Sequence, residues 1–270
     1  MNHQEVKSYL QVATQVAEEG GKVLTKYWGR LSNISKKSFT WDLVTEADQE
    51  SEEVILQLLT ELYPSHAILA EESGLKQAEE SEYLWVVDPL DGTTNYTHQY
   101  PMVCVSVALM FQNEIIAGVV YNPILNEMFQ AGRGLGSTLN QQAIQVSETG
   151  ALDHSLLATG FGYDRKQTAD TNYPEFCHLT HCSQGVRRGG SAALDLAYVA
   201  AGRLDGCWER GLYPWDMAAG VILIEEAGGK VTSYEGSPLV LESGRLMASN
   251  GHIHQEMIKE LRAARNKPEF

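Results

Sequence analysis

The pattern of apolar and polar positions predicts two helices at the start of the chain. Between residues 5 and 28 the apolar side chains recur every three or four positions, as they do on one face of a helix. A second helix is expected from Thr45, because an acid, Asp48, stands three residues after a hydroxyl that can cap the helix. Pro64 follows the apolar stripe of this segment and is expected to end the helix.

From residue 67 the pattern changes to short apolar runs separated by turn residues, which is typical of β-strands. The expected strands are 67–70, 83–87, 103–111 and 115–121, followed by a hairpin over 129–146. After residue 148 we expect strands near 155–159, 207–208, 230–233 and 245–248, and helices at 171–183, 191–202, 214–227 and after Asn250. The class is therefore mixed, α+β or α/β, with sheets covered by helices. We expect two sub-domains, 1–147 and 148–270, although no Pro/Gly/Ser-rich linker marks the boundary.

Charge and composition narrow the function. The 270 residues include 35 acids and 20 bases, a net charge of −15, which argues against binding to nucleic acid or to an anionic membrane surface. No apolar stretch approaches the roughly 20 residues that span a bilayer, and the first residues lack the basic start and apolar run of a signal peptide. The four cysteines suggest no disulfide framework, so a cytoplasmic protein is expected. An acidic chain that acts on an anionic substrate needs metal cations or helix N-termini to receive it.

Acidic residues gather at the ends of the predicted elements. Glu71 and Glu72 follow one strand, and Asp88 and Asp91 follow the next. Further acids stand at the starts of two helices, and these are Asp42, Asp48 and Asp216.

The segment 88–93 is the most informative of these. Pro89 is expected to stop the strand and to place Asp88 and Asp91 on one side of a tight turn, beside the backbone N–H groups of Gly92 and Thr93. Carboxylates beside amide donors form a place where hard cations and a phosphate can meet, and ligands that are all oxygen favour magnesium, manganese or calcium over zinc. Spacing alone leaves an equal alternative, in which the aspartates only cap a turn.

Six blocks, in order along the chain, resemble the inositol monophosphatase family. They are 42–48 (DLVTEAD), 70–74 (AEESG), 85–96 (WVVDPLDGTTNY), 190–195 (GSAALD), 201–205 (AGRLD) and 215–229, where WDMAAG is followed by EAGG. The resemblance covers almost the whole chain. It implies a layered α-β-α-β-α sandwich of two sub-domains, as in fructose bisphosphatase, with most metal ligands in the first sub-domain and the substrate contacts and one ligand in the second.

The resemblance also implies roles for individual residues. One magnesium ion would be bound by Glu71, Asp88 and the carbonyl of Leu90, a second by Asp88, Asp91 and Asp216, and a third, weaker ion would lie near Glu71. The catalytic residues would be Glu71, Thr93 and Asp48, of which the last two position the attacking water. The substrate contacts would be Asp91, Gly92, Thr93, Gly190, Ser191, Ala192, Glu209 and Asp216. Lys37 matches a lysine on a mobile loop of the family.

The activity implied by the resemblance is Mg²⁺-dependent hydrolysis of a phosphate monoester, above all myo-inositol monophosphate, by metal-activated water. Two or three ions per site are expected, with Mn²⁺ as a substitute, Li⁺ and Ca²⁺ as inhibitors, and a homodimer as the assembly. The alternatives are a related phosphatase that acts on fructose-1,6-bisphosphate, histidinol phosphate or phosphoadenosine phosphate, or a non-catalytic binding protein of the same fold. Residues 92–96 (GTTNY) resemble the inositol branch, because nucleotide phosphatases of the superfamily usually carry a lysine after Gly-Thr.

The chain departs from the family pattern at two places. Ala70 stands where a glycine often precedes the two glutamates, and Asn140-Gln141 stands where Asn-Gly is usual, which suggests a different turn. Neither position is a metal ligand or a catalytic residue.

Several other motifs resemble functional sites but also have structural interpretations. The segment 132–136 (GRGLG) lacks the third glycine of a dinucleotide loop and is expected to form a hairpin, and Ser191 lies outside the Gly-x-Ser-x-Gly pattern of serine nucleophiles. The segment 177–182 (CHLTHC) holds residue types that bind zinc, but no distal pair completes a site, so a helix with packed cysteines is expected. Arg187 and Arg188 suit substrate placement and surface or interface pairing equally well.

Overall fold

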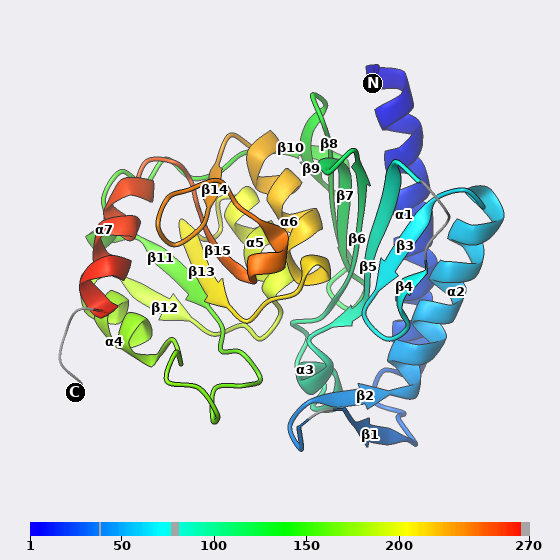
Figure 1. The fold of residues 1–270 in the computed structure, drawn as a ribbon, viewed down its shortest axis with the longest axis horizontal. Helices are drawn as coiled ribbons and strands as arrows, with labels where there is room; N and C mark the ends of the chain where they lie inside the picture. The colour runs from blue at the N-terminus through cyan, green and yellow to red at the C-terminus, as the bar shows by residue number, and fades with distance from the viewer. Residues whose placement is uncertain (38, 77–80, 266–270) are drawn as a thin grey trace.

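The computed structural model describes residues 1–37, 39–76 and 81–265, and these residues stack in five layers (Figure 1). The helices are α1 (His3–Tyr27), α2 (Glu46–Leu62), α3 (Thr93–Thr97), α4 (Tyr173–Cys182), α5 (Ala192–Ala200), α6 (Pro214–Glu226) and α7 (His254–Arg265). Helices α1 and α2 cover one sheet, α5 and α6 lie between the two sheets, and α4 and α7 cover the outer face of the second sheet. The predicted α-β-α-β-α sandwich is confirmed.

The first sheet has eight strands in the order β10-β9-β8-β7-β6-β5-β3-β4. Its strands are β3 (Ala67–Ala70), β4 (Gly74–Lys76), β5 (Tyr83–Asp91), β6 (Cys104–Phe111), β7 (Glu114–Asn122), β8 (Glu127–Gly132), β9 (Gly136–Leu139) and β10 (Gln142–Ile144). All neighbours are antiparallel except β3 and β5, which run parallel. Because β3 and β5 are parallel, the acids that follow Ala70 and Val87 lie at the same edge of the sheet.

The second sheet has five strands in the order β12-β11-β13-β15-β14. Its strands are β11 (Leu156–Thr159), β12 (Gly185–Arg187), β13 (Gly206–Arg210), β14 (Lys230–Thr232) and β15 (Arg245–Ser249). The change from one sheet to the other falls between Ile144 and Leu156, on either side of the predicted boundary at 147. That boundary stays a prediction, since the layer of α5 and α6 packs against both sheets.

Both N-terminal helices begin at capping boxes. Asn2 caps α1 with Glu5, and Thr45 caps α2 with Asp48, so two backbone N–H groups at the start of each helix are satisfied by side chains. The apolar faces of the two helices then pack against the eight-stranded sheet around the fully buried Trp85. Within the described ranges, no helix is long and apolar enough to cross a lipid bilayer.

Helix α6 is buried on every side between the two sheets. Its residues 217–224 are all inaccessible to solvent. Gly118 of β7 allows this approach, because a Cβ there would lie 2.5 Å from the Ile222 side chain. Gly220 does the same toward α5, where a Cβ would lie 2.4 Å from that of Leu196. The close packing fixes the start of α6, and with it the position of Asp216.

The prediction that Pro89 stops its strand is wrong, because β5 continues to Asp91. The pairing with β6 shifts register between Asp88 and Asp91, which is the irregularity that a residue without an N–H requires. The N–H of Leu90 bonds to Oδ1 of Asp88 at 2.9 Å instead of to the neighbouring strand. The bulge therefore aims Asp88 and Asp91 toward the same side of the sheet edge.

The segment 129–146 also differs from its prediction, since it forms parts of three strands rather than one hairpin. The last reversal is a two-residue turn between Leu139 and Gln142. Both of its residues have positive φ, +48° at Asn140 and +68° at Gln141, so the backbone is the one that Asn-Gly favours. The expectation of a different turn is wrong. Short strands that the hydrophobic pattern did not indicate are β1 (Ile34–Lys36), β2 (Leu43–Thr45), β4 and β12.

This turn generates a stability prediction. Replacing Gln141 by glycine removes the steric cost of a left-handed residue, about 1–2 kcal/mol, and adds the entropic cost of glycine, about 0.5–1 kcal/mol. We expect Gln141→Gly to raise the free energy of unfolding by about 0.5 kcal/mol, or the melting temperature by about 1–2 °C. Calorimetry checks the shift. The control is Gln142→Gly, one residue into β10, which should destabilise; equal shifts of the same sign in both variants would contradict the conformational argument.

Candidate active site

A pocket of about 330 Å³ opens where the end of β5, the start of α6 and the segment before α5 meet. Both halves of the chain contribute to its lining. Glu71, Asp88 and Asp91 come from the first half, and Glu209 and Asp216 come from the second. Its volume is at the lower end of the range for small-molecule sites, about 300–1,000 Å³, and suits a ligand of monosaccharide size.

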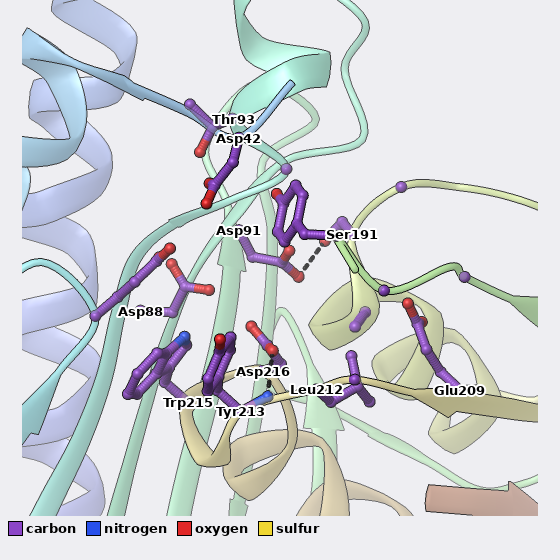
Figure 2. A pocket seen from close by; sticks show the side chains of 18 of the residues that line it. Asp42, Asp88, Asp91, Thr93, Ser191, Glu209, Leu212, Tyr213, Trp215 and Asp216 are labelled. Carbon is purple, nitrogen blue, oxygen red and sulfur yellow. Dashed lines mark hydrogen bonds between the residues drawn. The ribbon is translucent and has the colours of Figure 1, made fainter. Parts of the chain in front are cut away.

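Three aspartates converge at one side of the pocket (Figure 2). One carboxylate oxygen of each of Asp88, Asp91 and Asp216 lies within 4.8 Å of the others. Each carboxylate is held by a backbone amide: Asp88 by Leu90 N–H at 2.9 Å, Asp91 by Ala193 N–H at 2.8 Å, and Asp216 by Tyr213 N–H at 2.7 Å. Ser191 adds its hydroxyl, which donates to Oδ2 of Asp91 at 2.7 Å. These bonds hold three like charges at one point.

Burial and mutual repulsion raise the pKa values of this cluster. Burial raises the pKa of Asp91 to about 6, although the bonds from Ser191 and Ala193 oppose the shift. The pKa values of Asp88 and Asp216 lie well above the ordinary value, first because of burial and then because of the neighbouring carboxylates. Without a bound cation, the cluster is therefore electrostatically strained.

Glu71 enters the pocket from the end of β3. Its Oε1 accepts a bond from the Lys37 ammonium at 2.7 Å, and the same ammonium pairs with Glu72. Burial raises the pKa of Glu72 to about 7, while for Lys37 the two ion pairs outweigh burial and raise the pKa. The lysine ammonium thus neutralises part of the negative charge of Glu71 and Glu72, as a bound metal ion would.

Thr93 and Asp48 form a buried pair behind the pocket. The Thr93 hydroxyl lies 2.9 Å from Oδ1 of Asp48 and 3.2 Å from the carbonyl of Leu90. The other oxygen of Asp48 accepts from the N–H and hydroxyl of Thr45, the capping box of α2. Burial raises the pKa of Asp48 to about 6. The residue that caps α2 therefore also orients Thr93.

Gly92 shapes the backbone between Asp91 and Thr93. It has φ +93°, and a Cβ there would lie 2.7 Å from the carbonyl of Met102, so only glycine fits. The amide of Asn95, one turn on, donates to Met102 at 2.7 Å and to the carbonyl of Gly189 at 3.0 Å. This side chain ties α3 to the segment that leads into α5.

Glu209 faces the pocket from β13, on the side away from Asp88 (Figure 2). Its carboxylate lies over Gly160, where a Cβ would come within 1.8 Å of Oε1. From the sequence alone, Glu209 could also be a surface residue that pairs with Arg210 or Arg187. Arg210 is instead bonded to Asp164 at 2.7 Å, and in the described part of the chain no ion pair joins Glu209 to either arginine. Burial raises the pKa of Glu209 to about 8, while the charge of Arg188 opposes the shift.

The remaining predicted residues take clear places. Leu90, Gly190, Ser191 and Ala192 line the same pocket, and Asp48 supports it from behind. Arg188 also lines the pocket and Arg187 does not, although both side chains are exposed. Ser191 caps α5 and is bonded to Asp91, which fits the rejection of a serine nucleophile.

One side of the pocket is an apolar wall that the sequence analysis did not predict. It consists of Phe161, Tyr163, Leu212, Tyr213 and Trp215. The rings of Tyr213 and Trp215 stack with centroids 4.9 Å apart, next to Asp216 (Figure 2). The only available signal was that the two residues flank Pro214, ahead of a predicted helix.

Two segments meet beside the pocket mouth. Trp41, between the lining residues Phe39 and Asp42, donates its indole N–H to the carbonyl of Tyr163 at 3.1 Å. The Lys166 ammonium lies 3.9 Å from the centroid of the same indole ring. Residues of the first and second halves of the chain are thereby joined across the entrance.

The donor set fits magnesium. All candidate ligands are oxygens, from Glu71, Asp88, Asp91, Asp216 and the carbonyl of Leu90, and hard cations prefer such ligands. A cation would also relieve the repulsion that raises the pKa values of the aspartates. The chemistry is that of a site for divalent cations next to backbone amides that can bind an anion.

Comparison with known proteins agrees with this geometry. The model of the inositol monophosphatase family matches residues 5–266. An inositol-1-monophosphatase of Synechocystis sp. is 52% identical over 259 residues, which cover 96% of this chain and 90% of that protein. A protein of Pseudomonas aeruginosa named Nus factor SuhB is 42% identical over 246 residues, 89% of this chain and 91% of that protein.

A solved structure is similar throughout. The inositol monophosphatase of Anabaena (Nostoc) sp. superposes with a TM-score of 0.89 at 51% identity, covering 96% of this chain and 97% of that one. The predictions of the family, of the layered fold and of a phosphoric monoester hydrolase are confirmed.

The raised pKa values generate a pH prediction for the metal-free protein. A carboxyl whose pKa moves from 3.8 unfolded to about 6 folded, as for Asp91, binds more protons in the folded state between these values. The stability that this carboxyl contributes is therefore full below about pH 4 and is lost as the pH rises through about 6. Glu72 and Glu209, with pKa values raised to about 7 and about 8, extend the loss toward pH 8. Melting temperatures in EDTA should fall over this range, and Mg²⁺ should restore several degrees at pH 8 but almost none at pH 4.

Asp216→Asn serves as the matched variant, because it removes one repelling charge and keeps an acceptor for Tyr213. In EDTA at pH 8 it should melt several degrees above the wild type. A variant that melts lower there would contradict the repulsion argument.

Proposed function

The chain belongs to the inositol monophosphatase family, and on this premise we propose that it hydrolyses myo-inositol monophosphate to inositol and phosphate. The proposal is supported above all by the convergence of Asp88, Asp91 and Asp216, whose carboxylate oxygens lie within 4.8 Å of one another. They line the same pocket as Gly92 and Thr93. Phosphate-monoester hydrolysis is extremely slow without a catalyst, so the site must stabilise a highly charged transition state.

The family is Mg²⁺-dependent, and the chain's oxygen ligands divide into two sets. Glu71, Asp88 and the carbonyl of Leu90 would hold one ion, and Asp88, Asp91 and Asp216 a second, with a third, weaker ion near Glu71. When bound, the ions supply positive charge that lowers the pKa of water and neutralises the leaving group. We further propose that Mn²⁺ can substitute and that Li⁺ and Ca²⁺ inhibit.

Thr93 and Asp48 would position the attacking water. With the Thr93 hydroxyl donating to Asp48 at 2.9 Å, its lone pairs remain to accept a hydrogen bond from the water. Glu71, at the same edge, would accept a second hydrogen bond from that water. The amides of Gly92 and Thr93 would donate to the phosphate oxygens, which the left-handed backbone of Gly92 permits.

The inositol ring would bind between Glu209 and the metal side of the pocket, which is formed by Glu71, Asp88, Asp91 and Asp216. With its pKa raised to about 8, the Glu209 carboxyl can accept or donate a hydrogen bond to a ring hydroxyl near neutral pH. Gly190, Ser191 and Ala192 would supply the remaining contacts from the start of α5.

The alternatives concern the substrate and the class of protein. A related phosphatase activity, on fructose-1,6-bisphosphate, histidinol phosphate or phosphoadenosine phosphate, would use the same metal side and differ around Glu209. A binding role without catalysis is a second candidate, because a relative 42% identical is named a Nus factor. The presence of Glu71, Asp88, Asp91 and Asp216 favours catalysis. We also propose a homodimer in the cytoplasm, without binding to nucleic acid or membrane.

The metal assignment predicts the effect of Asp91→Asn. The amide keeps an acceptor for Ser191 and Ala193 but removes one negative charge from the metal side, so the fold should persist and turnover should fall at least about a hundredfold. Steady-state assays on inositol 1-phosphate at saturating Mg²⁺ test this. The control is Asp153→Asn, an exposed aspartate outside the pocket, which should retain full activity. Wild-type turnover in Asp91→Asn would refute the assignment.

The substrate assignment predicts the effect of Glu209→Gln. In assays at about pH 9, where Glu209 is ionised despite its raised pKa, loss of a charge-assisted hydrogen bond, about 1.5–3 kcal/mol, should lower kcat/KM for an inositol phosphate about tenfold to a hundredfold, mostly through KM. An aromatic phosphate without hydroxyls should be hydrolysed equally by both enzymes.

Gly160→Ala provides an independent test of the same residue. Its Cβ would lie 1.8 Å from Oε1 of Glu209, so it must move that carboxylate without changing its charge. We expect it to reproduce the loss of Glu209→Gln on the inositol phosphate only. Equal losses on both substrates would place Glu209 in the chemistry or the fold, and no loss in either variant would remove it from substrate binding.

A further inference from the structure

Three side chains of different donor type meet between α4 and α7, in the outermost helical layer. His178 and Cys182 lie one turn apart on α4, and Glu260 reaches them from α7. Nε2 of His178 lies 2.7 Å from Oε2 of Glu260 and 3.7 Å from Sγ of Cys182, and that sulfur lies 3.9 Å from the same Glu260 oxygen. The partner that the 177–182 motif lacked in the sequence is thus supplied by an acid 78 residues further along the chain.

The spacing of the three atoms is close to that of a tetrahedral metal site. Zinc binds sulfur at about 2.3 Å, imidazole nitrogen at about 2.0–2.1 Å and carboxylate oxygen at about 2.0–2.2 Å. Tetrahedral angles then place sulfur about 3.6 Å from nitrogen and from oxygen, and nitrogen about 3.3 Å from oxygen. The two distances that involve Cys182 agree to within about 0.3 Å, and the His178–Glu260 pair needs to open by about 0.6 Å.

The surrounding structure holds these groups in place. His178 is buried, and Cys182 packs against an apolar cluster that contains Leu179, Met257 and Leu261. A second link between the same helices, from Nε of Arg265 to Oε1 of Glu175 at 2.8 Å, fixes their relative position. Because α4 and α7 are already docked, a metal ion would meet a site that is largely preformed.

The donor types decide which metal suits the site. Thiolate and imidazole are softer ligands than the carboxylates of the pocket, and they favour zinc over magnesium. We propose that His178, Cys182 and Glu260 bind Zn²⁺, with water as the fourth ligand, and that the ion links α4 to α7. Binding would release the Cys182 thiol proton to solvent. The proton between Nε2 of His178 and Glu260 would move to Nδ1, or leave to solvent if the imidazole is already protonated there, and two bonds to the metal would replace that hydrogen bond.

The competing explanation needs no metal. His178 and Glu260 form an ion pair when the histidine is protonated, and Oε1 of Glu260 also pairs with Lys259 at 3.2 Å. That pair alone would fasten the two helices, and Cys182 would then be a packing residue. The two explanations differ in whether the sulfur bonds to a metal.

Cobalt titration of the full-length protein separates them. Co²⁺ added to metal-stripped enzyme in excess Mg²⁺ should give a near-ultraviolet band from thiolate-to-cobalt charge transfer, at one equivalent per chain, together with the visible bands of a tetrahedral ion. The pocket's ligands are all oxygens and cannot produce the thiolate band. Zn²⁺ should abolish the band by displacement and should raise the melting temperature of the metal-stripped protein.

Variants identify the ligands. Cys182→Ser should lose the charge-transfer band, and His178→Gln and Glu260→Gln should weaken Zn²⁺ binding at least about tenfold to a hundredfold, while all three keep Mg²⁺-dependent phosphatase activity. The matched controls are Cys177→Ser and His181→Gln on the same helix, which should bind as the wild type does. No thiolate band in the wild type, or a band that survives Cys182→Ser, would overturn the proposal. A band independent of Glu260 and His178 would overturn the three-ligand assignment.

Discussion

Electrostatic repulsion among Asp88, Asp91 and Asp216 is the constraint on which the structure depends. Three carboxylates within 4.8 Å of one another would separate in an unfolded chain, yet each is held by a backbone amide at a bulge or at the start of a helix. The free energy that holds them together comes from packing elsewhere, above all from the burial of α6 between the two sheets. The site is therefore stabilised by the core and not by its own contacts.

This arrangement explains why the two halves of the chain cannot be considered separately. Asp91 ends a strand of the first sheet, but its carboxylate is bonded to Ser191 and Ala193 at the start of α5. Asn95 makes a second link, to the carbonyl of Gly189. A cation bound to Asp91 and Asp216 would make a third. Hydrogen bonds thus join the two halves at the candidate site, in addition to the packing of α6 between the two sheets.

The sequence predicts most of this structure because its signals are local. The capping box at Thr45 and the apolar spacing of α1 and α2 mark those helices within a residue or two, and the acids at strand ends point to the metal side. The errors have local causes as well: Pro89 sits at a bulge where its missing N–H costs nothing, and Gln141 takes a left-handed turn that its residue type does not favour. The apolar wall around Tyr163 and Tyr213, and the approach of Glu260 to Cys182, arise from tertiary packing, and the sequence offers no more than the position of Pro214 to indicate them.

The contact between Trp41 and Tyr163 bears on how quickly ligands exchange. One hydrogen bond of about 1 kcal/mol and two cation–π contacts to Trp41, from Lys166 and Arg165, of about 0.5–1 kcal/mol each join the segments on that side of the entrance. Their sum, about 2–3 kcal/mol, leaves the two segments apart for roughly 1–3 per cent of the time. Loop fluctuations occur in nanoseconds to microseconds and enzyme turnovers take about a millisecond or longer, so an opening this frequent would recur many times within one turnover. Breaking these contacts would therefore not limit the rate at which ligands exchange.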